Sequence, residues 1–267
     1  MRDALRAARS VLFLTLYALY LALYFGLVQR LVIWPLTRLF PGRHNRIMSG
    51  WFRHLANSTL WQARVIGGVR ITVSGEVPPG SAVVVMNHQS LLDIPLVYSK
   101  VGPPYPVIPT RALYAWGIPG VSLLLRLARH PLVHQTRESR RQDVVAIAHA
   151  ADAVARGESS ILIFPEGHRT RDGEIGPFMR AGLRAILVRA RRPVYLLVVD
   201  GLWRARTTAD ALLHFAGMQG ALQVLGPFDP PVEEALDAFV DELRQRMCAE
   251  LDSMRGRPPQ GRTEAAT

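Results

Sequence analysis

A histidine and an aspartate stand five positions apart in a short polar segment. The segment is Asn87–Asp93 (NHQSLLD), and it directly follows Ala82–Met86 (AVVVM), an apolar run that reads as a β-strand. Proteins with alternating strands and helices place their binding and catalytic residues at the carboxyl ends of strands. His88 and Asp93 are therefore the first candidates for chemistry.

These two side chains cannot share one face of a regular helix, because five residues rotate a helix by about 140°. They can meet if His88 lies in the turn and Asp93 lies in the first turn of a following helix. Asp93 would then accept a hydrogen bond from one ring nitrogen, which leaves the other nitrogen free as a base. No serine or cysteine nucleophile is evident beside the pair. The dyad therefore suits activation of a hydroxyl that the substrate brings.

The same residues also allow a purely structural interpretation. Ser90-Leu91-Leu92-Asp93 matches the capping box [ST]-x-x-[DE], and the expected helix is Leu91–Ser99. Asp93 would then cap a helix and take no part in chemistry. The two interpretations are compatible, because a cap at Ser90 would also position Asp93.

A second polar segment, Phe164–Gly173 (FPEGHRTRDG), follows another expected strand, Ser160–Phe164. Gly167 permits a tight turn of the backbone. Arg169 and Arg171 offer charge-assisted hydrogen bonds to a phosphate. The alternative interpretation is a polar surface turn without a ligand.

The sequence lacks the spacing typical of metal sites. It has eight histidines and one cysteine, without H-E-x-x-H or paired C-x-x-C. His130 and His134 are four apart, but Pro131 interrupts any helix there. We expect no metal and no bound cofactor. The single cysteine, Cys248, excludes an intrachain disulfide and so permits a reducing compartment.

The charge balance of the whole chain favours an anionic partner. Its 267 residues include 32 Lys and Arg against 21 Asp and Glu, a net charge of +11. Nucleic acid, an anionic lipid surface and a phosphorylated substrate all fit such an excess. The mean hydropathy of +0.12 is high for a soluble protein, so apolar residues should be concentrated somewhere.

That concentration lies at the N-terminus, in Val11–Val28. As a helix, these residues would span about 27 Å, just enough to cross a hydrocarbon core. A transmembrane helix and an in-plane or re-entrant anchor both remain open, because Leu31–Leu36 continues the apolar surface past Arg30. A signal peptide is disfavoured, since no small-residue cleavage site follows.

The rest of the chain alternates short apolar runs with helical stretches. His44–Ile66 is amphipathic and could pack on the domain or lie at a lipid interface. The remaining expected strands are Val69–Val73, Val107-Ile108, Leu132–His134, Val194–Val199 and, at an edge, Leu222–Leu225. The remaining expected helices are Gly120–Arg129, Glu138–Arg156, Ala181–Arg191 and Pro231–Met254. This alternation predicts an α/β fold with a mostly parallel sheet flanked by helices.

Together, the two polar segments resemble the glycerolipid and lysophospholipid acyltransferase family, typified by 1-acyl-sn-glycerol-3-phosphate acyltransferase. Asn87–Asp93 matches the family's Asn-His-x4-Asp block, and Phe164–Thr170 its Phe-Pro-Glu-Gly-x-Arg-Ser/Thr block. Gly120–Arg137 resembles a middle block that ends in arginine, and Pro193–Leu197 an apolar strand opened by proline. The resemblance covers about residues 65–205, and Val198–Gly201 continues differently from the family.

The resemblance implies transfer of an acyl group from acyl-CoA or acyl-carrier protein to the hydroxyl of a membrane lipid, and no nucleic-acid partner. The implied acceptor is 1-acyl-sn-glycerol-3-phosphate, which gives phosphatidic acid. Another lyso-lipid acceptor, or a non-catalytic protein that binds anionic lipid, is the alternative. The implied location is the cytoplasmic face of the bacterial inner membrane. The expected divisions are an anchor at 1–40, an acyltransferase domain at 41–256 and a disordered tail at 257–267.

The resemblance also assigns roles to residues. His88 and Asp93 would be catalytic, and backbone N–H groups at the start of the helix after Ser90 would stabilise the oxyanion. The implied substrate-binding residues are Asn87, Arg137, Glu166, Gly167, Arg169 and Thr170.

Overall fold

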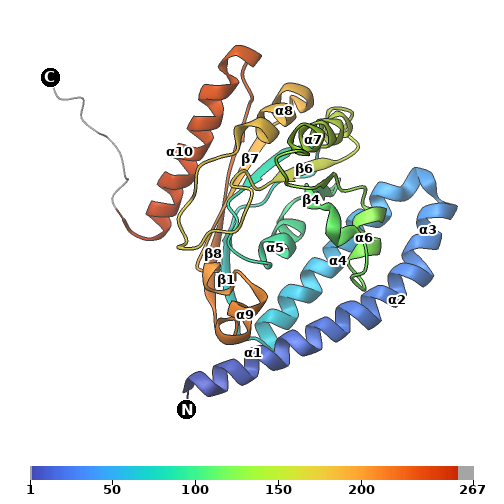
Figure 1. Ribbon diagram of the computed structural model, residues 1–267, viewed down its shortest axis with the longest axis vertical. Helices are drawn as coiled ribbons and strands as arrows, with labels where there is room; N and C mark the ends of the chain where they lie inside the picture. Colours follow the sequence, from blue (N-terminus) through green and yellow to red (C-terminus); the bar gives the residue numbers. More distant parts are fainter. Residues whose placement is uncertain (1, 258–267) are drawn as a thin grey trace.

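The computed structural model describes residues 2–257, and a six-stranded sheet forms the centre of that part (Figure 1). The order across the sheet is β1-β8-β7-β2-β6-β3. The strands are β1 (Arg70–Ser74), β8 (Gln219–Phe228), β7 (Val194–Asp200), β2 (Val83–Met86), β6 (Ser160–Ile163) and β3 (Pro106–Val107). Neighbouring strands are parallel except β7 and β8, which confirms the predicted mostly parallel sheet.

The three middle strands, β7, β2 and β6, form the core of the sheet. Every residue of β2 and β6 is buried, and so is every residue of β7 except Asp200. Strands covered on both faces read as continuous apolar runs, which is why the sequence identified these three. The covering helices include α5 (Asp93–Lys100), α7 (Arg140–Ala155), α8 (Arg180–Ala190) and α10 (Leu236–Met254).

The prediction of an edge strand at Leu222–Leu225 is wrong. Strand β8 is longer than predicted and lies inside the sheet, between β1 and β7. Only Leu222 within it is buried, so its side chains carry little of the apolar signal that marks an interior strand. Its position is decided by backbone pairing with both neighbours, which the sequence does not display.

Several smaller elements complete the domain. The predicted strand at Leu132–His134 appears as β5 (Leu132–Val133), which pairs with β4 (Thr110–Arg111) outside the central sheet. The predicted helix at Gly120–Arg129 is shorter, as α6 (Ser122–Leu127). Short α9 (Thr208–His214) was not predicted. Of the tail predicted at 257–267, all but the first residue lies outside the described part.

The N-terminal segment is helical from Arg2 to Leu39, and its 36 residues Ala4–Leu39 are apolar and long enough to cross a membrane. It consists of α1 (Arg2–Leu19), α2 (Gly26–Val28) and α3 (Trp34–Leu39), joined by π-helical turns at Tyr20–Phe25 and Gln29–Ile33. At about 1.5 Å per residue it is about 54 Å long, well beyond the thickness of a hydrocarbon core. We call it the N-terminal helix.

One stripe of the N-terminal helix is packed against the domain along its length. Its buried side chains are Ser10, Phe13, Phe25, Gln29, Ile33 and Thr37. Phe13 stacks on Phe215 with ring centroids 4.2 Å apart. Further along, Gln29 Nε2 donates to the carbonyl of Gly120 at 2.7 Å. A helix that crossed a membrane would have to leave these contacts, so the docked stripe favours the in-plane interpretation.

The N-terminal helix runs antiparallel to α4 (His44–Val65), which matches the predicted amphipathic helix (Figure 1). Tyr17 bonds Thr59 through their hydroxyls at 3.1 Å, and the Phe25 ring lies 4.4 Å from that of Trp51. Trp61 is 61% exposed. Helix α4 therefore packs on the domain along one face and leaves Trp61 outside.

Candidate active site

His88 and Asp93 are in direct contact at the carboxyl end of β2. His88 Nδ1 and Asp93 Oδ2 are 2.7 Å apart. Asp93 is completely buried, whereas the His88 side chain is 17% exposed. A ring nitrogen that faces a carboxylate carries the proton, so the neutral His88 ring keeps its lone pair on Nε2. His88 thus has the geometry of a general base whose ring is oriented by the Asp93 carboxylate.

Asp93 also holds the turn that presents His88. Its Oδ2 atom accepts from the backbone N–H groups of Gln89 at 2.6 Å and of Ser90 at 2.8 Å. Ser90 Oγ accepts from the N–H of Leu92 at 3.0 Å, and the helix begins at Asp93, two residues later than predicted. Asp93 therefore organises the helix start and contacts the histidine at once, so the two interpretations of this segment coexist.

The predicted oxyanion donors are occupied. The N–H groups of Ser90, Leu92 and Asp93 donate to the Asp93 carboxylate, the Ser90 hydroxyl and the Ser90 carbonyl respectively. An N–H group that already donates within the turn is not open to a developing oxyanion. This expectation from the sequence is wrong for these three groups, because the turn uses them to hold itself.

Glu166 is a brace for the His88 turn, not an exposed ligand for substrate. It is buried, and its Oε1 accepts from the N–H of His88 at 3.0 Å. Its Oε2 accepts from the N–H of Gly176 at 2.9 Å. Burial raises the pKa of the Glu166 carboxyl above its ordinary value, although these two hydrogen bonds oppose the rise. Both oxygens bond the protein backbone, and the predicted contact of Glu166 with substrate stays a prediction.

Thr170 holds His88 from the other side. Its N–H donates to the carbonyl of His88 at 2.8 Å. Its hydroxyl donates to Asp172 at 2.9 Å and accepts from the N–H of Gly173 at 3.1 Å. Thr170 is buried and positions the histidine, and its predicted contact with substrate stays a prediction.

The second polar segment therefore encloses His88 through contacts with its backbone N–H, its carbonyl and its ring. In addition to Glu166 and Thr170, the Phe164 ring stacks on the imidazole with centroids 4.0 Å apart and planes inclined by 19°. Gly167 has a φ of +72°, and a Cβ atom there would lie 2.4 Å from Met179 Sδ. Only glycine fits this position without moving Met179.

Asn87 is a structural residue. It is buried, and its side chain exchanges two hydrogen bonds of 2.8 Å with the backbone N–H and carbonyl of Val199. The amide thus continues the pairing between β2 and β7 past the end of β2. The side chain is thus placed to hold β7, and the predicted substrate contact of Asn87 stays a prediction.

The two predicted phosphate-binding arginines are placed differently. Arg169 is half-buried in the second polar segment, and its Nη1 donates to the carbonyl of Arg206. Arg137 is exposed in the turn between β5 and α7. The neighbouring N–H groups of His134 and Gln135 are bound by Asp143 at 2.9 and 2.8 Å. Of the two, only Arg169 belongs to the segment that encloses His88.

Sequence reasoning missed the residue that joins these segments, Gln89. Gln89 is fully buried, and its Oε1 accepts from the N–H of Leu202 at 2.9 Å. The sequence shows its position between His88 and Ser90 in a polar block. The partners of its side chain, however, lie more than 80 residues away along the chain. No group of His, Cys, Asp and Glu that could hold a metal ion occurs among residues 2–257.

Comparison with known proteins shows similarity to one family. A family model described as Acyltransferase matches residues 69–199. A 1-acyl-sn-glycerol-3-phosphate acyltransferase from Cocos nucifera is 29% identical over 191 residues, 68% of this chain and 59% of the relative. One from Pseudomonas aeruginosa is 28% identical over 157 residues, 58% of this chain and 57% of the relative. The chain thus spans less than two thirds of either relative.

A solved structure shares the fold. The crystal structure titled as the 1-acyl-sn-glycerophosphate (LPA) acyltransferase PlsC from Thermotoga maritima superposes with a TM-score of 0.68. The match covers 95% of this chain and all of that chain, at 23% sequence identity. The likeness extends beyond the central domain into the N-terminal helix, because 95% coverage cannot be reached without it.

Proposed function

Because residues 69–199 form a domain of the Acyltransferase family, we propose that this protein transfers a fatty acyl group from a thioester to the hydroxyl of a lysophospholipid. The proposed acceptor is 1-acyl-sn-glycerol-3-phosphate, and the product is phosphatidic acid. The donor is acyl-CoA or acyl-carrier protein, and no bound cofactor takes part. The single observation that carries the proposal is the 2.7 Å contact between His88 Nδ1 and Asp93 Oδ2 in a braced turn.

The proposed reaction begins at Nε2 of His88. This nitrogen takes the proton of the acceptor hydroxyl as its oxygen attacks the thioester carbonyl. Asp93 stabilises the imidazolium that forms. The tetrahedral intermediate then collapses, the carbon–sulfur bond breaks, and the thiolate leaves. A thiol has a pKa of about 8.5, so its departure needs little help from an acid, and the proton on His88 returns to solvent or to the thiolate.

We assign the acceptor phosphate to Arg169. It lies in the segment that encloses His88, and its Nη1 is fixed on the carbonyl of Arg206, which leaves its other nitrogens for an anion. Arg137 is a second candidate, supported by its place at the end of the middle sequence block.

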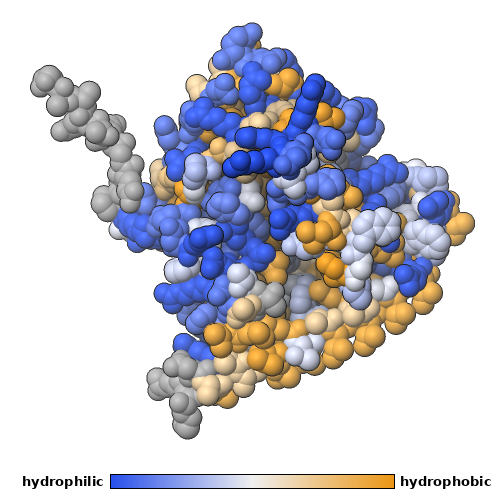
Figure 2. Space-filling model, in the orientation of Figure 1, coloured by the Kyte–Doolittle hydropathy of each residue, from blue (hydrophilic) through white to orange (hydrophobic). Residues whose placement is uncertain are grey.

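We place the protein on a membrane surface, with the N-terminal helix lying in the plane of the interface. The outward face of this helix exposes large apolar side chains, among them Leu16, Leu19, Leu23, Leu27 and Leu31. Figure 2 shows a hydrophobic band along the N-terminal helix, at one edge of the molecule. A contiguous apolar face of this extent is typical of a membrane or protein interaction site, and the acceptor and product are lipids.

The apolar surface extends onto a neighbouring loop. Leu113 and Trp116 are 61% and 69% exposed. The loop is held against the N-terminal helix where Gln29 bonds the carbonyl of Gly120. The Arg126 guanidinium lies 4.5 Å from the Trp116 ring centroid. A tryptophan beside an arginine suits the boundary between lipid and water. We assign the site to the cytoplasmic face of the membrane, where both candidate donors occur.

Thiol release from acyl-CoA, measured against a panel of lysolipids in vesicles, tests the proposal. The expected result is release that depends on 1-acyl-sn-glycerol-3-phosphate, with phosphatidic acid as the product. Release with another lysolipid would change the acceptor and keep acyl transfer. Vesicle binding without thiol release, with acyl-CoA and with acyl-carrier protein as donor, would instead support a non-catalytic lipid-binding protein.

A further inference from the structure

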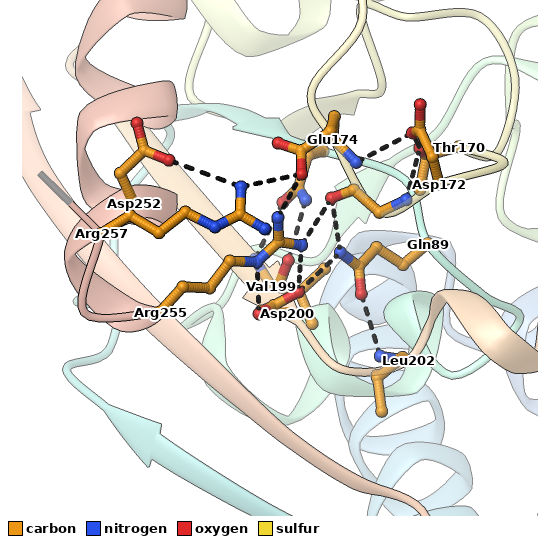
Figure 3. A network of polar contacts seen from close by, with 12 residues as sticks. Gln89, Thr170, Asp172, Glu174, Val199, Asp200, Leu202, Asp252, Arg255 and Arg257 are labelled. Carbon is orange, nitrogen blue, oxygen red and sulfur yellow. Dashed lines mark hydrogen bonds and ion pairs between the residues drawn. The ribbon is translucent and has the colours of Figure 1, made fainter. Parts of the chain in front are cut away.

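A mostly buried arginine reaches the active-site segments from the end of α10. The side chain of Arg255 is 12% exposed, and its guanidinium binds both carboxylate oxygens of Asp200 at 2.8 and 2.6 Å. The same guanidinium donates to the carbonyl of Gly173 at 2.8 Å and to Glu174 at 2.7 Å (Figure 3). Asp200 and Arg255 both lie outside the residues that the family model matches.

One route from this ion pair leads through Gln89 to Asp93. Gln89 Nε2 lies 3.4 Å from both Asp200 Oδ1 and the carbonyl of Gly173 (Figure 3). The backbone N–H of Gln89 donates to Asp93 Oδ2, the atom that also contacts His88. The Arg255 guanidinium therefore binds both acceptors of the Gln89 side-chain amide, which are Asp200 Oδ1 and the Gly173 carbonyl oxygen.

A second route leads through Gly173 to His88. The Gly173 carbonyl is held by Arg255, and its N–H donates to the Thr170 hydroxyl at 3.1 Å. The N–H of Thr170 in turn donates to the carbonyl of His88 at 2.8 Å. The two routes start at one guanidinium and end on the two members of the dyad.

The Asp200–Arg255 pair is of a strong type. It is a two-point contact between a guanidinium and a carboxylate, with the Asp200 side chain 20% exposed. Burial alone would raise the pKa of the Asp200 carboxyl, but the hydrogen bonds and charge of Arg255 hold it below its ordinary value. Removal of Arg255 would leave the largely buried Asp200 carboxylate without its counterion.

We propose that Asp200 and Arg255 form a latch that positions His88 and Asp93, by holding the Asn87–Asp93 turn, the 170–176 loop and the end of β7 together. Both are positioning residues, because they act through Gln89 and Gly173 and do not touch the histidine. The positioning of His88 and Asp93 by this latch does not depend on the proposed function. Its expected effect on acyl transfer does rest on the proposed function.

Arg255→Met tests the latch, and Arg257→Met is its matched control. Arg257 also follows α10 and also binds Glu174, at 3.0 Å, but it is exposed and its described contacts do not include Asp200 or Gly173. In Arg255→Met, amide hydrogen exchange in residues 87–93 and 170–176 should be at least about tenfold faster. The kcat should fall on the order of 10- to 100-fold. The KM values for donor and acceptor should stay within about twofold of wild type.

Arg257→Met should leave both exchange and kcat unchanged. Arg255→Lys should recover part of the kcat, since lysine keeps the charge but not the two-point contact. If Arg255→Met does not fold, Asp200→Asn should show the same acceleration of exchange in residues 87–93. Wild-type exchange and kcat in Arg255→Met, or equal losses in Arg257→Met, would overturn the latch.

Exchange is measured without turnover, so it separates the latch from the proposed reaction. A wild-type protein that fails to consume acyl thioester contradicts the proposed function alone. Unchanged exchange in Arg255→Met contradicts the latch alone.

Discussion

Two regions of this molecule are built on opposite principles. At the carboxyl ends of β2, β6 and β7, the Asn87–Asp93 turn is held by many hydrogen bonds, some within the turn and several between a side chain and a distant backbone group. Along the N-terminal helix, large apolar side chains lie on both faces: one face packs against the domain with a few hydrogen bonds, and the other is exposed. In the first region, hydrogen bonds fix the positions of individual atoms. In the second region, apolar packing fixes only which face of the helix meets the domain.

The difference follows from the two kinds of force. Hydrogen bonds are directional, and a buried polar group without a partner costs about 1–3 kcal/mol, so the turn has one stable arrangement. Apolar burial is non-directional and scales with area, so a helix face tolerates rearrangement. A single substitution should therefore disable the turn, whereas the helix face should lose function gradually.

The largest expected effect is that of His88→Ala. Loss of the base should lower kcat by on the order of 10³- to 10⁴-fold. The variant should remain folded and bound to vesicles, because the ring of His88 is not part of the apolar face. Thiol release, circular dichroism and vesicle flotation measure the three properties. Turnover like that of the wild type would show that the dyad is not the catalytic pair.

A buried histidine, His130, packs between α4 and the backbone at Ile108. His130 accepts from the N–H of Ile108 at 2.9 Å, and its ring lies 5.8 Å from that of Phe52 on α4. Burial lowers the pKa of His130 to about 3. Because this folded value is below the unfolded value of about 6.5, His130 should cost stability as the pH falls from about 6.5 toward 3, on the order of 4 kcal/mol in all.

Unfolding by denaturant across this pH range, compared with His130→Asn, measures the effect. Asparagine keeps an acceptor for Ile108 but does not titrate, so its pH slope should be shallower. Parallel slopes for the two proteins would assign the acid sensitivity to other groups.

Loss of apolar area should weaken membrane binding by degrees. Leu23 and Leu27 are 59% and 56% exposed and lie one helical turn apart. Leu23→Ser/Leu27→Ser should reduce partition into vesicles by about 10- to 100-fold and leave thiol release in detergent intact. Val145→Ser/Val232→Ser, which removes two exposed valines outside the helix, is the control and should bind as the wild type does. Equal loss in both variants would argue against a specific membrane face.

Glu166→Gln distinguishes a brace from a substrate ligand. A glutamine can accept from only one of the two N–H groups that Glu166 holds, so kcat should fall by about tenfold and stability by about 1–3 kcal/mol. The acceptor KM should stay constant. Glu158→Gln, at an exposed ion pair with Arg156, serves as control. A raised acceptor KM with normal kcat would restore the substrate-binding role that the sequence suggests.

The smallest expected effect is at Arg169. Arg169→Ala should raise the acceptor KM by about tenfold, as the loss of one charge-assisted contact to a phosphate implies. Steady-state kinetics with acceptor and donor varied separately measures it. An unchanged acceptor KM with a raised donor KM would move Arg169 to the donor side.

The sequence by itself determined the fold class and the dyad. Buried middle strands read as apolar runs, and polar residues directly after them mark the carboxyl edge of a parallel sheet. The five-residue spacing of His88 and Asp93 permits contact only across a turn, and this constraint can be read within the seven-residue segment itself. Local patterns of this kind need no knowledge of distant partners.

The tertiary structure alone decided what the other polar residues do. Asn87, Glu166 and Thr170 have types and positions that suit a ligand, yet each is bound by backbone groups of another segment. Likewise, β8 lies inside the sheet and Arg255 reaches Asp200 across 55 positions. A polar side chain can satisfy its hydrogen bonds with substrate or with backbone, and only the folded chain shows which partner is within reach.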